Sequence, residues 1–457
     1  MLRKTTRQLL LFFIAICCVI AISSFTSHSQ AIPSKGRDRS IDRLTIDNRQ
    51  KATSDGSQNW GSVITGVESQ WEQQYEEYFE EDFTSSKLTP EQIAKKLREI
   101  SRETGKKAAV LWVMSQPKQL NLLLITPQGA PVSQEIRAAD RETLSKVSQD
   151  FVEKLSNLSN GYLASARLLH RWLISPIEPY LEAEQIDTLI MCLGGGLRTL
   201  PFAALYDGER FLIEKYSLTR IPGFYLTPIS RGNLSDAKVL AMGATEFKEQ
   251  ASLPAVAVEL SAITPDPWQG ETILNEEFTV ENLEVQRDRE PFQIIHLATH
   301  ADFVPGKPRD SYIQFSDRKL TLDQLNELGW KEPPVELLVL SACETAVGDR
   351  TAEMGFAGLA LQSGVRSALA SLWYVSDAGT LALMSEFYQQ LKNIPLKAEA
   401  LRQTQISMLK GKVYLRERQL VNSRGDISLP PALAESPETN LSHPFYWASF
   451  TLIGSPW

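Results

Sequence analysis

The chain has 457 residues, which is enough for two or three domains and a sizeable apolar core. Its net charge of −8 argues against nucleic acid as the main partner, because nucleic-acid binding depends on basic surfaces. The four cysteines form neither a disulfide framework nor a CxxC zinc pattern, and the sequence predicts no metal and no cofactor.

Residues 1–31 have the pattern of a targeting segment. Three basic residues precede an unbroken apolar run from Leu9 to Ile22. Because that run is short for a membrane-spanning helix, the pattern favours a secretory signal peptide, with a retained membrane anchor as the alternative. We therefore expect an exported protein, in the periplasm or another extracytoplasmic compartment, or one anchored in the membrane by this segment.

Residues 32–67 are polar and mixed in composition, which predicts a linker without a core. The next region, 68–237, opens with a helix on which Trp71, Tyr75 and Phe79 recur at helical spacing. This aromatic stripe is expected to pack on the body of the protein, and a docking surface for a partner is the alternative. Beyond it the pattern predicts further helices and strands, over 90–100, 108–114, 120–126, 138–157, 162–182 and 188–193.

Three consecutive glycines, Gly194 to Gly196, follow the last of these strands. No Lys-Ser or Lys-Thr pair comes after them and no GxGxxG pattern opens a helix, so we interpret them as a turn rather than a phosphate loop. Cys192 lies inside the apolar strand before them and is predicted to be an inert core thiol.

Residues 238–457 alternate strands with helices, which predicts right-handed crossovers and a mostly parallel sheet. Two apolar runs in this region carry reactive side chains near their ends: one reaches His300 and the other reaches Cys343. Parallel strands bring their carboxyl ends to one edge, where open α/β sheets bind ligands. Because the thiolate is the nucleophile and needs a basic partner, the two runs predict a thiol dyad.

The remaining elements of this region follow the same periodicities. We expect helices over 255–264, 279–285, 322–328, 354–363, 377–392 and 396–410, and strands over 239–243, 272–274, 312–315, 319–322, 367–373 and 448–453. A polar insertion between 412 and 440 precedes the last strand, and it is predicted to be an exposed loop and the main site of proteolytic nicking.

Several motifs, in this order along the chain, resemble the CHAT domain family. They are LRTLPFAALYDG at 197–208, HLATHA at 296–301, LLVLSACETAVGD at 337–349, GFAGLALQSGVRSALASLWYVSD at 355–377 and HPFYWASFTLIG at 443–454. That family is caspase-like, is related to separase and other His/Cys-dyad peptidases, and is common in cyanobacteria. The resemblance implies an α/β fold, with a caspase-like, mostly parallel sheet flanked by helices and an N-terminal α/β subdomain.

The resemblance also implies a cysteine endopeptidase whose dyad is His300 and Cys343, with acyl transfer to the cysteine assisted by the histidine. The expected oxyanion donors are the backbone N–H groups of Ala301 and Cys343. His296 lies about 13 Å before His300 along the same strand, and we expect it to be a buried, hydrogen-bonded structural residue.

Two acidic residues, Glu344 and Asp377, lie near the same predicted edge. In related peptidases such residues select Arg or Lys at the cleaved position, and a carboxylate does so by pairing with the substrate cation. The alternative for Asp377 is an N-cap of the helix that follows it, a position that Asp favours.

The expected partners are a protein or peptide substrate and an activating protein. Members of the family often follow tetratricopeptide repeats, and this chain shows no such repeat. The alternative function is a non-catalytic caspase-like scaffold that binds proteins or peptides. The presence of both dyad residues favours the enzyme.

Overall fold

The computed structural model describes residues 59–457 except 84, 233, 347 and 434–439, and for Ala342 and Cys343 it describes the backbone alone. The predicted targeting segment, residues 1–31, lies outside the described residues. Within the described ranges, no helix has both the length and the apolar character needed to cross a membrane.

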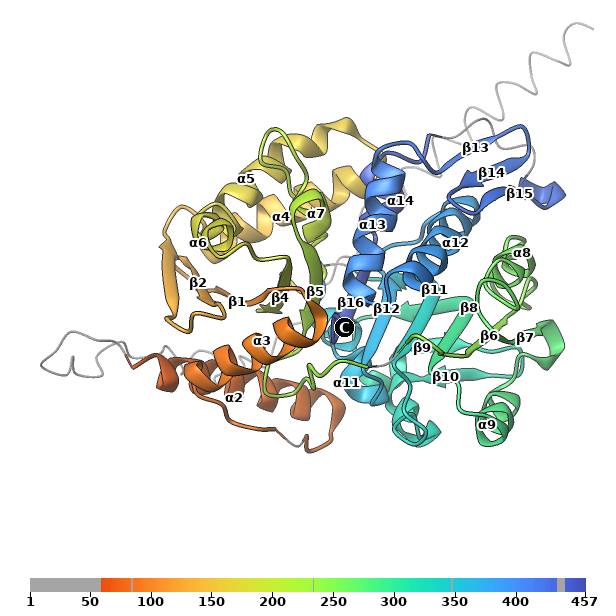
Figure 1. Cartoon of the computed structure of the whole chain (residues 1–457), viewed down its shortest axis with the longest axis horizontal. Coiled ribbons are helices and arrows are strands. Elements are labelled where there is room, and N and C mark those ends of the chain that lie inside the picture. The colour runs from red at the N-terminus through yellow and green to blue at the C-terminus, as the bar shows by residue number, and fades with distance from the viewer. Residues whose placement is uncertain (1–58, 84, 233, 347, 434–439) are drawn as a thin grey trace, which may run out of the picture. The chain divides into compact units, whose positions relative to one another are not determined.

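One 13-stranded sheet runs through the described part of the chain (Figure 1). Its main path has the order β10-β9-β8-β11-β12-β16-β5-β4-β1-β2-β3, and β6 pairs with β7 and with β8. The strands are β1 (Ala108–Ser115), β2 (Leu120–Ile125), β3 (Val132–Ile136), β4 (Thr188–Leu193), β5 (Ser217–Ile221), β6 (Val239–Gly243), β7 (Gly270–Leu274), β8 (Ile294–Phe303), β9 (Tyr312–Gln314), β10 (Lys319–Thr321), β11 (Leu337–Thr345), β12 (Ser367–Ser371) and β16 (Phe450–Gly454).

Two parallel blocks make up most of this sheet. Strands β7, β6, β8, β11 and β12 run parallel to one another, as do β16, β5, β4 and β1. The blocks meet where β12 and β16 pair antiparallel, and antiparallel hairpins extend both edges. The predicted α/β class, with a mostly parallel sheet flanked by helices, is confirmed.

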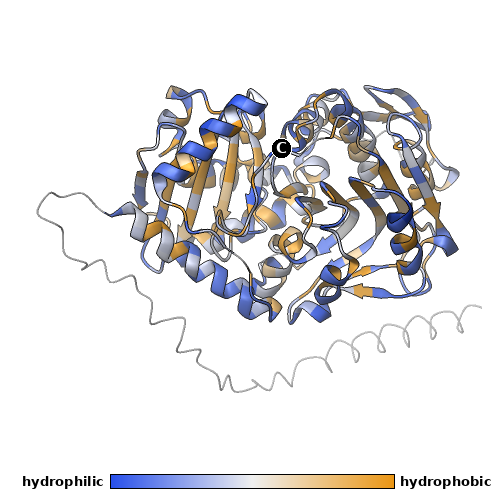
Figure 2. Cartoon of the chain, turned by 60° about the horizontal axis from the view of Figure 1, so that its bottom comes forward, coloured by the Kyte–Doolittle hydropathy of each residue, from blue (hydrophilic) through white to orange (hydrophobic). Residues whose placement is uncertain are grey.

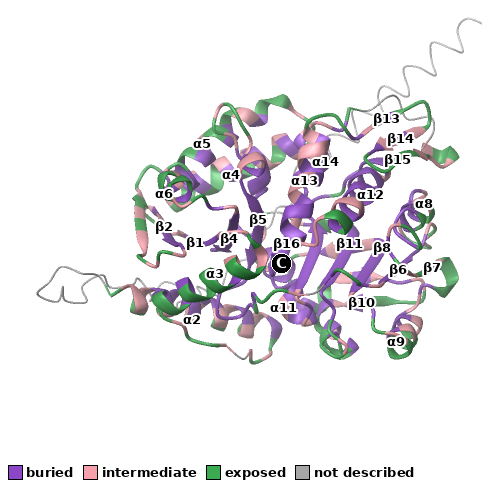
Figure 3. Cartoon of the chain, in the orientation of Figure 1, coloured by how far each residue is buried: buried purple, intermediate pink, exposed green. Residues whose placement is uncertain are grey.

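Helices surround the sheet and bury its apolar strands. In Figure 2 the strands are largely orange, and in Figure 3 they are largely purple while outward helix turns are green. The helices are α2 (Trp60–Phe79), α3 (Pro90–Thr104), α4 (Arg141–Ser156), α5 (Leu163–Leu173), α6 (Glu178–Ala183), α7 (Leu212–Lys215), α8 (Val256–Ser261), α9 (Val280–Arg289), α10 (Arg350–Ala357), α11 (Leu359–Ser363), α12 (Asp377–Asn393), α13 (Lys397–Leu409) and α14 (Pro444–Trp447).

Helix α2 corrects the predicted linker over 32–67. It begins at Trp60, because Asn59 caps its first turn and Ile64 and Val67 are buried on its inner face. Its aromatic stripe packs on the body, as one of the two interpretations predicted. A buried carboxyl, Glu68, lies on the same face and accepts a 2.6 Å hydrogen bond from the indole N–H of Trp112.

Three other predictions need correction. The helix expected over 162–182 is divided into α5 and α6, and the one over 354–363 is divided at Gly358 into α10 and α11. The insertion between 412 and 440 is not simply a loop. It contains a separate three-stranded antiparallel sheet, made of β13 (Tyr414–Arg416), β14 (Gln419–Asn422) and β15 (Gly425–Ser428).

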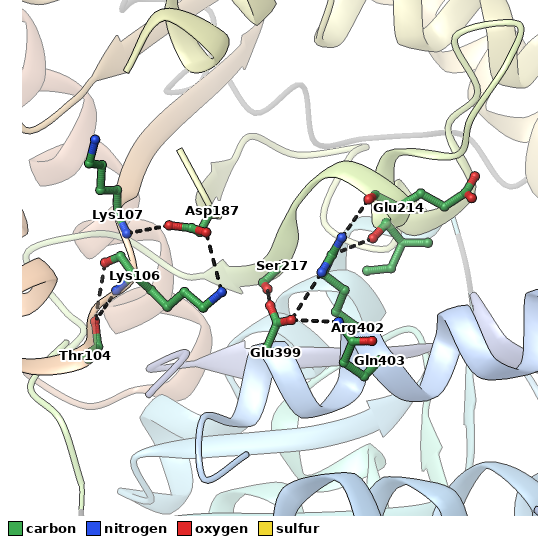
Figure 4. Close-up of polar contacts among 10 residues, drawn as sticks. Thr104, Lys106, Lys107, Asp187, Glu214, Ser217, Glu399, Arg402 and Gln403 are labelled. Carbon is green, nitrogen blue, oxygen red and sulfur yellow. Dashed lines mark hydrogen bonds and ion pairs between the residues drawn. The ribbon is translucent and has the colours of Figure 1, made fainter. Parts of the chain in front are cut away.

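The end of the chain joins the two blocks of the sheet, because β16 lies between β12 and β5. Helix α13 adds polar contacts to β5 and α7, which belong to the region before residue 238 (Figure 4). The Ser217 hydroxyl of β5 donates a 2.5 Å hydrogen bond to the Glu399 carboxylate. The guanidinium of Arg402 donates both to Glu399, at 3.1 Å, and to the Glu214 carbonyl oxygen at the end of α7, at 2.6 Å.

Candidate active site

The register of β8 and β11 places the two predicted dyad residues on adjacent strands, one position apart. The strands are parallel, and their paired positions include Ala342 with His300 and Cys343 with Ala301. An irregularity between Leu340 and Ala342 shifts the register just before the dyad. Adjacent strands lie about 5 Å apart, so the backbones of His300 and Cys343 are neighbours.

His300 is held by the segment that connects β6 to α8. Its Nε2 lies 2.8 Å from the carbonyl oxygen of Ala251, and its ring meets that of Phe247 edge to face at 4.9 Å. Because a carbonyl oxygen can only accept, Nε2 carries the proton of this bond. The other nitrogen, Nδ1, is then the basic one in the neutral ring.

Asp377 lies near His300. The alternative prediction, that Asp377 caps helix α12, is wrong. The N-cap of α12 is Ser376, whose hydroxyl accepts from the Gly379 N–H. The Asp377 carboxylate instead accepts a 2.9 Å hydrogen bond from the Tyr374 hydroxyl. Burial raises the pKa of Asp377, although the Tyr374 hydroxyl, the Ala255 N–H and the nearby His300 each lower it.

Two other predicted site residues, Glu344 and Ala301, lie on the same two strands as the dyad. Glu344 is exposed on β11, opposite Asp302 of β8. Ala301 is buried and paired on both sides, with Cys343 of β11 and with Ile313 of β9. Its role as an oxyanion donor stays a prediction, as does that of the Cys343 N–H, and it requires an N–H that is free of strand pairing.

The structural role predicted for His296 is confirmed. The residue is fully buried, its Nε2 lies 2.9 Å from a Glu259 carboxylate oxygen of α8, and its Nδ1 lies 3.1 Å from the Tyr388 hydroxyl of α12. Burial raises the pKa of Tyr388, which favours the neutral phenol as the donor to Nδ1. These bonds fasten both helices to the strand that carries His300.

Cys192 and the glycine run also behave as predicted. Cys192 is fully buried, and burial raises the pKa of its thiol, which makes it a poor nucleophile. The chain turns at the glycines, where Gly196 has a φ of 86°. Its N–H donates a 2.8 Å hydrogen bond to the carboxylate of Glu353, so this N–H is already occupied by a protein acceptor.

A cluster of potential metal ligands lies in the N-terminal half. His170, Glu178 and Asp207 offer ligand atoms within 4.8 Å of one another. The ammonium of Lys215 already lies 2.7 Å from Glu178 and 2.6 Å from Asp207. The Lys215 ammonium therefore already pairs with both carboxylates, and the arrangement is that of an ion-pair cluster.

Sequence reasoning missed Ala251 and Phe247, the residues that hold His300. Ala251 acts through its backbone carbonyl, which every residue type carries, and a single aromatic in a polar connection is not distinctive. The two adjacent residues Ser376 and Asp377 are both favoured N-caps, so the choice between them also needed coordinates.

The chain is similar to a known protein family and to solved structures. The CHAT domain family matches residues 163–455. No curated protein matches the chain. Two crystal structures of the Saccharomyces cerevisiae separase–securin complex are similar to it at 9% and 10% identity, with TM-scores of 0.47 and 0.45 over 79% and 81% of this chain.

The chain spans 31% of the length of those separase chains. A complex of the Porphyromonas gingivalis RgpB pro- and mature domains is similar over 69% of this chain and 77% of its own, at 9% identity and a TM-score of 0.36. The family match covers more than half of the chain and includes both strands of the predicted dyad. The chain belongs to the CHAT domain family.

Proposed function

We propose that this protein is a cysteine endopeptidase whose nucleophile is Cys343 and whose proton carrier is His300. The observation that carries the proposal is the register of β8 and β11, by which the backbones of the two residues lie one position apart on adjacent parallel strands, near the carboxyl ends of both. The Ala251 carbonyl supports it further, because it leaves Nδ1 of His300 as the basic nitrogen.

The chemistry is acyl transfer to sulfur followed by hydrolysis. The Cys343 thiol gives up its proton to the His300 imidazole and attacks the peptide carbonyl carbon, which forms a tetrahedral oxyanion. The protonated imidazole then gives a proton to the leaving amine as the C–N bond breaks. Water, deprotonated by His300, attacks the thioester and releases the acid, which regenerates the thiol.

We extend the proposal to selectivity for Arg or Lys at the cleaved position. Asp377 supports this, because its partly buried carboxyl lies near His300 and is not used as the helix cap. A carboxylate shielded from water pairs more strongly with a cation than an exposed one does. Glu344 is exposed and is the weaker candidate.

The location and the control of the enzyme also belong to the proposal. The basic and apolar pattern of residues 1–31 supports export or membrane anchoring. An activating protein partner is also part of the proposal. Ala301 is paired with strands on both sides, and its N–H could bind an oxyanion only if that pairing loosened. Binding of a partner protein would be the means of loosening it.

The test is cleavage of a mixed peptide library by the full-length chain, kept in reducing buffer with mild detergent. We expect cleavage after Arg or Lys, loss of activity of at least about a thousandfold in Cys343→Ala and in His300→Ala, and near-normal activity in Cys192→Ala. Cleavage that persists in Cys343→Ala would refute the proposal.

Thiol alkylation separates a latent enzyme from the scaffold alternative when no peptide is cut. A nucleophilic Cys343 should react with iodoacetamide much faster than Cys192, whose thiol is buried. Alkylation of Cys343 at the rate of an ordinary thiol, together with no cleavage, would favour the scaffold.

A further inference from the structure

Tyr374 is an exposed aromatic residue beside the candidate active site. It lies in the segment that connects β12 to α12, and 43% of its surface is exposed. The residue before it, Trp373, is buried, and its ring stacks on that of Phe445 while its indole N–H donates to the Phe445 carbonyl oxygen. Trp373 therefore anchors this segment to the core, and the ring of Tyr374 is left at the surface.

The hydroxyl group of Tyr374 is bound to the carboxylate of Asp377. The phenol donates a 2.9 Å hydrogen bond to Oδ1 of that carboxylate. A carboxylate offers about four acceptor sites on its two oxygens, and the Tyr374 hydroxyl and the Ala255 N–H use two of them. Asp377 is thus held in place while it keeps acceptor sites for a substrate cation.

An exposed ring next to a carboxylate suits a guanidinium better than an ammonium. A planar guanidinium can pair with a carboxylate and also stack on an aromatic face, whereas the ammonium of lysine is compact and strongly hydrated. Attraction between a cation and an aromatic face acts within about 6 Å of the ring centre. A substrate cation paired with Asp377 falls within this reach, because one hydrogen bond joins the ring's own hydroxyl to the carboxylate.

Asp377 also depends on Tyr374 for its charge. Burial raises the pKa of Asp377, and the negative charge of Glu259 on α8 raises it further. Three groups lower the pKa: the Tyr374 hydroxyl, the Ala255 N–H before α8 and His300 on β8. The Tyr374 hydroxyl has the largest effect of the three, so it does most to keep the carboxylate ionised.

We propose that Tyr374 is a specificity-determining residue, whose hydroxyl positions the Asp377 carboxylate and whose exposed ring stacks on the substrate side chain, so that Arg is preferred to Lys at the cleaved position. The inference rests on the proposed peptidase function and narrows its substrate class from cationic side chains to arginine. The ring and the hydroxyl have separate effects, which two substitutions distinguish. Tyr374→Phe keeps the ring alone, and Tyr374→Leu keeps neither.

The test of the ring measures kcat/KM of the full-length chain for peptides that differ only at the cleaved position, which is Arg, Lys or Gln. At about pH 8 we expect kcat/KM for the Arg peptide to be about fivefold that for the Lys peptide, as one cation–π contact predicts. Tyr374→Phe should keep this ratio. Tyr374→Leu should lower it to about twofold or less.

The hydroxyl has its own readout, which is the pH at which the Arg/Gln ratio of kcat/KM falls to half. In Tyr374→Phe this midpoint should lie about one pH unit higher than in the parent chain, because the carboxylate loses a bond that favours its charged form. A structural role alone would change stability and leave the midpoint in place. When Asp377→Asn is already present, Tyr374→Phe should not change the Arg/Gln ratio at any pH.

Tyr180→Leu is the matched control, because Tyr180 is also an exposed tyrosine, at 41%. Figure 1 shows its helix, α6, near β2, at the other end of the sheet from β8. This variant should keep both the Arg/Lys ratio and the midpoint. An unchanged Arg/Lys ratio in Tyr374→Leu overturns the role of the ring, and an unchanged midpoint in Tyr374→Phe overturns the role of the hydroxyl.

Binding of the same peptides to the Cys343→Ala protein, followed by fluorescence anisotropy, separates this inference from the peptidase. Cleavage by the parent chain with equal kcat/KM for Arg and Lys overturns the role of Tyr374 and leaves the peptidase standing. Tighter binding of the Arg peptide that Tyr374→Leu abolishes, without cleavage by the parent chain, supports the role of Tyr374 and counts against the peptidase. The absence of both cleavage and selective binding overturns both.

Discussion

Asp377 is the residue whose protonation should control selectivity. Burial raises its pKa, so the carboxyl becomes neutral at a higher pH than the ordinary value of about 4. As pH falls through that raised pKa, the ratio of kcat/KM for peptides with Arg and with Gln at the cleaved position should fall. Peptide cleavage measured across the pH range checks this.

Asp377→Asn is the control for this pH dependence. The variant should have a low Arg/Gln ratio that is flat with pH, because its carboxamide cannot ionise. Equal cleavage after Asp and after Arg by the parent chain would contradict a cation-selective carboxylate at this position.

The sequence predicted those site residues that act through a distinctive side chain. His300 and Cys343 stand near the ends of apolar runs, and their strands pair as expected. The Ala251 carbonyl has no such signature, and neither do the hydroxyls of Ser148 and Thr345, which lack a hydrogen-bond partner among the described residues. Whether a hydroxyl is satisfied depends on neighbours that are distant in the sequence, so only the coordinates identify these groups.

Helix α2 is held on the body by its buried apolar face and by one buried carboxyl. Glu68 accepts hydrogen bonds from the Trp112 indole, at 2.6 Å, and from the N–H groups of Phe224 and Tyr225, at 3.0 and 3.1 Å. Glu68→Leu leaves three buried donors without an acceptor and should lower the free energy of unfolding by about 3 kcal/mol or more. Urea denaturation measures this.

Two further variants test the same anchor. Glu68→Gln keeps one acceptor oxygen and should cost less stability than Glu68→Leu. Glu77→Gln, on the exposed face, should change stability by about 0.5 kcal/mol at most.

Burial raises the pKa of Glu68, so the folded state holds the carboxyl proton more tightly than the unfolded state does. Stability should therefore decline as pH rises from about 4 through the raised pKa, and Glu68→Gln should lose this component.

Element prediction failed where buried polar side chains broke the apolar pattern. Strand β5, read as SLTRI, was missed although all five of its residues are buried. Its Ser217 pairs with Glu399, and the Arg220 guanidinium donates to Thr451 and to two carbonyl oxygens. These polar groups are satisfied by segments that are remote in the sequence, so the pattern of β5 alone could not indicate a central strand.

On the scale of the whole molecule, one core serves both predicted regions, 68–237 and 238–457. The larger cluster of buried apolar residues contains side chains from β1 and β4 as well as from β8, β11 and β12. Strand β16, the last of the chain, completes the sheet between β12 and β5. Parallel order in the block of β7, β6, β8, β11 and β12 followed from the alternation of strands and helices, whereas the antiparallel junction of β12 and β16 had no local signature.

Residues 238–457 should therefore not fold by themselves. Without β5, strand β16 would expose an unpaired edge, and the buried Glu399 and the Arg402 guanidinium would lose their partners on β5 and α7. We expect this fragment to aggregate or to lack a cooperative thermal transition, and the full-length chain to unfold cooperatively. Circular dichroism and size-exclusion chromatography measure both properties.

Co-expression of residues 59–237 with residues 238–457 is the matching rescue, because it returns β5 and α7 without restoring the covalent link. The two fragments should elute together and regain a cooperative transition, since the contacts of α13 with β5 and α7 are non-covalent. A soluble, monomeric 238–457 fragment that unfolds cooperatively at the temperature of the full-length chain would contradict a shared core. It would instead make the second region a domain in its own right.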